Sequence, residues 1–171
     1  MNKEEQIKEW FKKTDYYSLS ILKTISNYKD LLKKYSENWE KIISIPMYKR
    51  FISVINLFNS TNIDNSEVYL LILDVSYLFG VIIGSQKMFF TTLRETIIKK
   101  NRDYGSSFDK SVNKFGWVYV AIELDKKKNR LHSLLKNKEK PNYESVEDTL
   151  LDIAGYCVLS LIYLENKELK Q

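Results

Sequence analysis

Residues 144–166 read ESVEDTLLDIAGYCVLSLIYLEN, and this stretch decides the fold. From Leu150 to Tyr156, apolar side chains occupy nearly every direction around a helical axis. A helix that is hydrophobic all round is buried. The chain has only 5 Gly and 2 Pro in 171 residues, although sheets joined by tight turns need these residues at their corners. We therefore predict an all-α helical bundle with this helix inside it.

Helical periodicity divides the rest of the chain into further predicted helices. They cover residues 4–12, 16–35, 38–58, 66–101 and 109–136, with a kink at Pro46, weak points at Gly80 and Gly84, and a break at Gly116. Loops are predicted at residues 101–107 (NRDYGSS) and 137–143 (NKEKPNY). The clearest linker is 59–66 (NSTNIDNS), so we predict an N-terminal helical extension over residues 1–60 and a four-helix-like C-terminal body over residues 61–171.

The cellular setting follows from what the sequence lacks. The single cysteine, Cys157, cannot form an intramolecular disulfide, and its apolar neighbours predict an inert buried thiol. Residues 1–13 are charged and lack the apolar run of a signal peptide. The most apolar stretch, residues 68–83, is short for a membrane span and is interrupted by Asp74. We expect a cytoplasmic protein that makes no membrane contact.

The last helix carries the strongest chemical signal. Glu144, Asp148 and Asp152 fall at i, i+4 and i+8, so they share one face. Negative charge near a helix N-terminus is favourable, which accounts for the first two acids but not for Asp152. Because Asp152 lies among apolar residues, it is predicted to be buried, and a buried carboxylate must be neutralised, paired or bound to a metal.

The preceding helix supplies two further acids. With Leu124 facing the core, Glu123 and Asp125 lie about 100° to either side of it. Asp148 and Asp152 facing either of these acids would offer Mg²⁺ the oxygen ligands it prefers. The alternative is a salt-bridge network in which Asp152 pairs with Arg130 or a nearby lysine. The residues alone leave these two possibilities open.

Several classes of site are excluded. His132 is the only histidine, which rules out histidine-rich zinc sites. No phosphate-binding glycine loop and no cysteine pair is present. The net charge of +5 is compatible with phosphate ligands but identifies no partner, and apart from residues 126–128 the basic residues are not gathered into one run. Nucleic-acid binding is therefore the least favoured function.

Three segments together resemble a known family. They are KNRDYG at residues 100–105, DK at 125–126 followed by NRL at 129–131, and ESVEDTLLDIAGY at 144–156. In order and spacing they are similar to the nucleotide-modification-associated domain family of phages and bacteria. That family resembles, at a distance, the MazG-like all-α NTP pyrophosphatases, which hold Mg²⁺ between acidic helices. The resemblance covers roughly residues 90–166.

The resemblance implies roles for particular residues. It implies a Mg²⁺ site formed by Glu123, Asp125, Asp148 and Asp152, of which the three aspartates would take part in catalysis. It implies substrate contacts from Arg102, Asp103, Tyr104, Lys126 and Arg130. The acidic motifs depart from the MazG pattern, because the second reads D-x-x-x-D and Leu124 splits the first, while Glu37-x-x-Glu40 has no E-x-x-D after it.

Two functions follow as expectations. The first is a Mg²⁺-dependent nucleotide-binding protein, with nucleoside triphosphate pyrophosphohydrolysis as its reaction and a homo-oligomer as its assembly. The second is a non-catalytic, phage-encoded helical protein that binds a protein partner through N-terminal aromatic residues, namely Trp10, Phe11, Tyr16, Tyr17 and Trp39. The enzyme requires at least three of the four carboxylates to converge on an open pocket, whereas the binding protein predicts carboxylates that are scattered or paired with Lys and Arg.

Overall fold

The structure, a computed structural model, describes residues 1–13, 47–60, 62–83, 86–136 and 145–170. These residues form a helix at 3–13 and helices α3 (Tyr48–Phe58), α4 (Asn65–Ile83), α5 (Gln86–Tyr104), α6 (Ser107–Phe115), α7 (Val118–Lys136) and α8 (Val146–Glu168). No strand occurs in the described part of the chain. The predicted all-α fold is confirmed.

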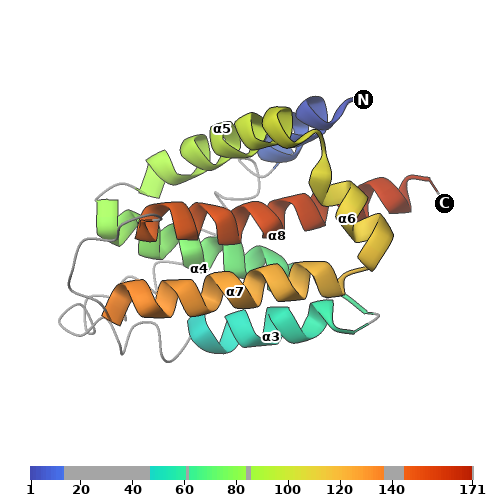
Figure 1. Ribbon diagram of the computed structural model, residues 1–171. Coiled ribbons are helices and arrows are strands. Elements are labelled where there is room, and N and C mark those ends of the chain that lie inside the picture. The colour runs from blue at the N-terminus through green and yellow to red at the C-terminus, as the bar shows by residue number, and fades with distance from the viewer. Residues whose placement is uncertain (14–46, 61, 84–85, 137–144, 171) are drawn as a thin grey trace.

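Helix α8 runs through the middle of the bundle, as predicted from its apolar sequence (Figure 1). It packs against α4 on one side, α7 on another and α5 on a third, while α3 lies against α7 and α4. Leu150, Ile153 and Val158 are fully enclosed. Enclosing each such side chain stabilises the fold by about 1.5–3 kcal/mol relative to leaving it exposed. Helix α8 is therefore anchored in the core along most of its length.

The start of α8 is set by a reciprocal cap. The Ser145 hydroxyl accepts a hydrogen bond from the Asp148 backbone N–H at 3.0 Å, and the Asp148 carboxylate accepts one from the Ser145 backbone N–H at 3.3 Å. This arrangement satisfies two backbone donors that a helix N-terminus leaves unpaired. Asp148 thus has a local structural role at the first turn of α8.

The joint between α5 and α6 is shorter than predicted. Residues 101–104 continue α5, so only Gly105 and Ser106 connect the helices, each with φ +57°. The polar composition of residues 101–107 suggested a loop, but Asn101 extends the helix by accepting the Gly105 N–H at its carbonyl, 2.9 Å away. Glycine reaches this left-handed conformation without steric cost. At the other end of α6, Gly116 has φ +73°, which confirms the predicted break.

The N-terminal helix belongs to the same core as the rest of the described chain. Trp10 and Phe11 are buried and pack together with α3 and α4 residues in one continuous hydrophobic cluster. The Lys3 ammonium lies 2.8 Å from the Asp109 carboxylate of α6. The Asn166 side chain donates a hydrogen bond to the Gln6 side chain at 2.9 Å, so the N-terminal helix contacts the last part of α8. The described N-terminal helix therefore shares its core with the helices that follow, and the division near residue 60 stays a prediction.

Some predictions fall outside the described residues. They concern the helix at 16–35, the first part of the helix at 38–58 with Pro46, Glu37 with Glu40, Glu144, Tyr16, Tyr17, Trp39, Gly84 and the loop at 137–143. Among the helices that are described, none is long and apolar enough to cross a membrane.

Candidate functional site

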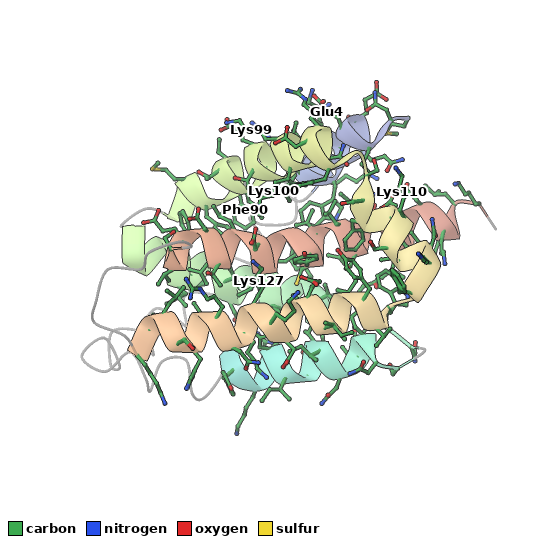
Figure 2. All side chains as sticks on the ribbon, viewed as in Figure 1. Glu4, Phe90, Lys99, Lys100, Lys110 and Lys127 are labelled. Atoms are coloured by element: carbon green, nitrogen blue, oxygen red, sulfur yellow. The ribbon has the colours of Figure 1, made fainter. Side chains whose placement is uncertain are left out.

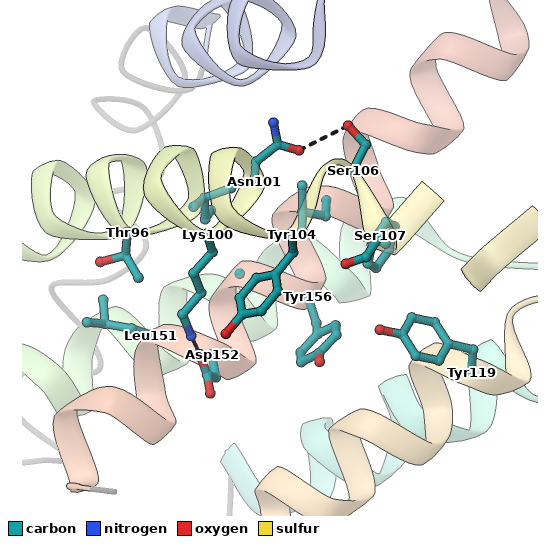
Figure 3. A pocket seen from close by; sticks show the side chains of 14 residues that line it. Thr96, Lys100, Asn101, Tyr104, Ser106, Ser107, Tyr119, Leu151, Asp152 and Tyr156 are labelled. Carbon is teal, nitrogen blue, oxygen red and sulfur yellow. Dashed lines mark hydrogen bonds and ion pairs between the residues drawn. The ribbon is translucent and has the colours of Figure 1, made fainter. Parts of the chain in front are cut away.

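A pocket of about 290 Å³ opens where α5, α6, α7 and α8 meet (Figure 3). Its charged and polar lining comes from four places in the sequence. Thr96, Lys100, Asn101 and Tyr104 come from α5, Ser106 and Ser107 from the joint and α6, Tyr119 from α7, and Asp152 and Tyr156 from α8. The two turns of helix that carry the sequence motifs, one at the end of α5 and one in the middle of α8, face each other across this pocket.

Asp152 lies in the wall between two lysines. The Lys100 ammonium contacts one carboxylate oxygen of Asp152, and the Lys127 ammonium lies 2.6 Å from the other. The side chain of Asp152 is 15% exposed, that of Lys127 is 20% exposed and that of Lys100 is 51% exposed. Burial alone would raise the pKa of Asp152, but the hydrogen bonds from both lysines lower it by more, so its pKa lies below the ordinary value. Asp152 is therefore an ionised, paired carboxylate at neutral pH.

The three charged residues come from three different helices. Lys100 projects from α5 and Lys127 from α7, each towards α8, which carries Asp152 (Figure 2). Because α8 packs against both α5 and α7, a lysine from each of these helices contacts Asp152 in the second turn of α8. Lys100 lines the pocket, whereas Lys127 is not among its lining residues and approaches Asp152 from the α7 side.

Aromatic side chains form the other part of the pocket. The rings of Tyr119 and Tyr156 pack edge to face, with centroids 6.3 Å apart, and Phe108 lies at the same distance from Tyr156. The Tyr156 hydroxyl donates a hydrogen bond to Glu123 at 3.3 Å. Burial foremost, with Tyr119 and Glu123 adding to it, raises the pKa of Tyr156, so this hydroxyl stays a neutral donor. Tyr104 differs from these rings, since it is 68% exposed at the pocket mouth.

The four predicted metal ligands do not converge. Asp148 caps α8, Asp125 pairs with Lys128 at 2.8 Å, and Glu123 pairs with Lys126 at 2.9 Å. Only Asp152 lines the pocket, and Glu123 reaches it indirectly through Tyr156. As predicted, Glu123 and Asp125 diverge on either side of the fully buried Leu124. Of the two possibilities for Asp152, a metal site or a salt bridge, the structure shows the salt bridge, with Lys100 and Lys127 as partners.

These acids do not fit a protein-held Mg²⁺ site. Mg²⁺ needs several oxygen ligands in nearly octahedral geometry. Within the described ranges, no group of three or more His, Cys, Asp or Glu residues is placed to hold a metal ion. Each of Glu123, Asp125 and Asp152 already has a lysine ammonium within hydrogen-bonding distance. The part of the chain that is described therefore offers cations to a ligand, and no carboxylate cage.

The predicted substrate-binding residues separate into two groups. Tyr104 lines the pocket. Arg102 lies on the other side of α5, where its guanidinium donates two hydrogen bonds to Glu4 at 2.8 and 3.0 Å. These hydrogen bonds, together with one from Lys8, lower the pKa of Glu4 to about 2. Asp103, Lys126 and Arg130 are not among the residues lining the pocket. Arg102 thus holds the N-terminal helix and does not face the pocket.

Several residues that form the site had no role predicted from the sequence. They are Lys100, Asn101, Tyr119, Lys127 and Tyr156. A signal existed for three of them, because Lys100 and Asn101 begin the KNRDYG segment and Tyr156 ends the acidic motif. Lys127 and Tyr119 had none, since their importance depends on how α7 is placed against α8.

Comparison with known proteins bears on this segment of the chain. Residues 100–164 match the family Nucleotide modification associated domain 1. The family predicted from the motifs is thereby confirmed over this segment, which is less than half of the chain. Apart from Thr96 and the apolar Ile97, every residue that lines the pocket lies within the nucleotide modification associated segment. No curated protein and no solved structure matches the chain, and the distant similarity to MazG-like enzymes stays a prediction.

Proposed function

We propose that the chain binds a nucleotide in the pocket between α5, α6, α7 and α8. One observation carries the proposal: both motifs of the nucleotide modification associated segment contribute side chains to the same pocket. That pocket combines a lysine with exposed aromatic surface, and nucleotide sites combine the same two features, a cation for phosphate and an apolar face for the base.

Lys100 is suited to a phosphate. Its side chain is half exposed and lines the pocket, so its ammonium can turn from Asp152 to a ligand. The turn leaves Asp152 paired, because Lys127 keeps the other carboxylate oxygen at 2.6 Å. A buried carboxylate left without any partner would be costly. Because Lys127 keeps Asp152 paired, Lys100 is available to bind a phosphate.

Tyr104 is suited to a nucleobase. Figure 3 shows its ring beside Lys100 and Tyr156, at the edge of the pocket. A base stacked on an exposed aromatic ring gains about 1–3 kcal/mol, and every base has a face that can stack. Ser107 and the hydroxyl of Tyr119 lie further along the lining, where they can hydrogen-bond a sugar or a base edge.

Isothermal titration with a panel of nucleotides, in Mg²⁺ and in EDTA, tests the proposal. The decisive variant is Lys100→Met, which removes the ammonium but keeps the length of the side chain. Its matched control is Lys99→Met, which removes the same charge one residue away, on the outer side of α5 (Figure 2). We expect binding to be weakened in the first variant and unchanged in the second. No binding of any nucleotide to the wild-type chain, or equal weakening in both variants, would reject the proposal.

Mg²⁺ dependence and hydrolysis are separate predictions from the sequence. The positions of the described carboxylates do not favour either property. The titrations in Mg²⁺ and in EDTA measure the Mg²⁺ dependence, and a pyrophosphate-release assay measures hydrolysis. Pyrophosphate release from a bound triphosphate would extend the function to pyrophosphohydrolysis. Binding that is the same in EDTA would instead assign recognition of the phosphate to the protein's own cations.

A further inference from the structure

We infer that the pocket takes a nucleoside monophosphate in preference to a diphosphate or triphosphate. This inference rests on the proposed function, since it names the ligand of the same site. It is carried by three observations: the charge of the pocket, its volume, and the positions of the acids around it.

The charge of the site matches a single phosphate. Among the described residues, Lys100, Lys127 and Asp152 in and behind the pocket wall carry one net positive charge, and Glu123, which lies behind Tyr156, is balanced by Lys126. A phosphomonoester carries about −1.5 to −2 at pH 7. Each additional phosphate adds negative charge, but Lys126 and Lys128, the neighbours of Lys127, are already paired with Glu123 and Asp125.

The acids around the pocket do not supply the missing charge through a metal. Proteins that bind triphosphates neutralise the chain of phosphates with Mg²⁺ held by carboxylates, or with several basic groups. Here Asp152 is occupied by two lysines and Asp148 by the cap of α8. A triphosphate would therefore bring more negative charge than the described side chains can neutralise.

The volume points the same way. At about 290 Å³ the pocket lies at the lower limit of ligand sites, which span roughly 300–1,000 Å³. The packed rings of Phe108, Tyr119 and Tyr156 line the pocket on the side of α6 and α7. With its base beside Tyr104 and its phosphate at Lys100, a monophosphate spans the open part of the lining.

The test is a titration of the full chain with one nucleoside and its mono-, di- and triphosphate, each in EDTA and in Mg²⁺. We expect the monophosphate to bind tightest, roughly tenfold or more above the nucleoside, which is the usual gain from a hydrogen bond to a charged group. The monophosphate affinity should not change with Mg²⁺. In Lys100→Met it should fall to the affinity of the nucleoside, while Lys99→Met keeps the wild-type order.

The possible outcomes separate this inference from the proposed function. Tightest binding of the diphosphate or triphosphate would overturn the inference and leave nucleotide binding standing. Equal binding of nucleoside and monophosphate would overturn the placement of phosphate at Lys100. No binding by any member of the series would overturn the proposed function itself. A 5′-phosphorylated oligonucleotide that binds more tightly than the free monophosphate would assign the site to a nucleic-acid end and overturn the inference.

Discussion

Asp152 shows how a single partly buried charge can organise a site. Its carboxylate sits on the central helix of the bundle, where a lone charge would be strongly unfavourable. Two lysines neutralise it, one largely buried and one half exposed. This difference in exposure matters. The half-exposed Lys100 can turn to a ligand, while the less exposed Lys127 keeps its ion pair with Asp152. Asp152, which was predicted to be a metal ligand, instead forms ion pairs with two lysines.

At the same scale, Tyr104 should contribute to binding and little to stability. Its ring is 68% exposed, so Tyr104→Ala removes a stacking surface but almost no core contact. We expect this variant to lose about 1–3 kcal/mol of nucleotide binding free energy, and Tyr104→Phe to keep most of it. Titration measures the affinity, and thermal unfolding should give a midpoint close to that of the wild type. A loss of affinity in Tyr104→Phe equal to that in Tyr104→Ala would assign the effect to the hydroxyl.

At the scale of elements, α7 should affect ligand binding through Lys127, which contacts Asp152 but does not line the pocket. Lys127→Met leaves Asp152 with Lys100 as its partner in the described structure, so Lys100 becomes less available to a phosphate. We expect roughly tenfold weaker monophosphate binding, a loss comparable to that of one charged hydrogen bond. Lys127→Arg should retain binding.

A second substitution tests this reasoning. In Lys127→Met with Asp152→Asn, no carboxylate restrains Lys100, so affinity should return towards the wild-type value. Such a recovery of affinity would show that residues 127 and 152 affect binding together. A double-mutant cycle measures the interaction energy between them. If the double variant binds as weakly as Lys127→Met alone, Lys127 must touch the ligand or support the fold directly.

The contact between α3 and α4 should depend on pH. Burial raises the pKa of Asp74 to about 6, even though the Arg50 guanidinium lies 2.8 Å from its carboxylate and Glu67 lies nearby. Because the folded state binds this proton more tightly than the unfolded state, the contribution of Asp74 to stability is largest below the ordinary pKa of 3.8. It is lost as the pH rises to about 6.

Asp74→Asn removes this titration. The stability of the variant relative to the wild type should therefore become more favourable as the pH rises from 4 to 7, when both are unfolded in urea. The pH values are chosen to bracket the shift from 3.8 to about 6. The opposite trend would mean that the ion pair with Arg50 outweighs the cost of burying the carboxylate.

Helix boundaries could be predicted where the backbone itself dictates them. Gly116 ends α6 and Ser145 caps α8 for local reasons, and the break at Gly116 was predicted from the sequence. The end of α5 was placed too early, because Asn101 and Arg102 look like loop residues by composition. In the fold these side chains bond to Ser106 and to Glu4, so tertiary contacts override the local preference.

At the scale of the whole molecule, the N-terminal helix should be part of the cooperative fold. Trp10 is 5% exposed and its ring packs against Phe11 and Tyr69. We expect Trp10→Ala to lower the free energy of unfolding by about 3–5 kcal/mol, as large-to-small core substitutions do. Met88→Ala is the control, since Met88 is 55% exposed and its loss should stay within about 0.5 kcal/mol. Equal effects in chemical denaturation would show that the helix contributes nothing to the core.

The candidate site could be predicted only in part, for a reason that belongs to the whole molecule. The partial burial of Asp152 follows from its neighbours along α8, and the divergence of Glu123 and Asp125 follows from the helical period of α7. The partners of Asp152 lie 52 and 25 residues away in the chain, on helices whose relative positions no local pattern specifies. It was therefore predictable from the sequence that Asp152 needs a partner, but the identity of its partners, Lys100 and Lys127, depends on the fold.

The single cysteine gives this bundle a built-in reporter. Cys157 is fully enclosed on α8, and burial raises the pKa of its thiol, so the reactive thiolate is scarce while the chain is folded. A thiol reagent added to the native protein should thus react only when the bundle opens, at a rate set by the opening equilibrium. A ligand that binds only the folded chain will slow this labelling in proportion to its concentration and affinity. An unmodified wild-type chain can accordingly be screened for ligands by following one chemical reaction at its centre.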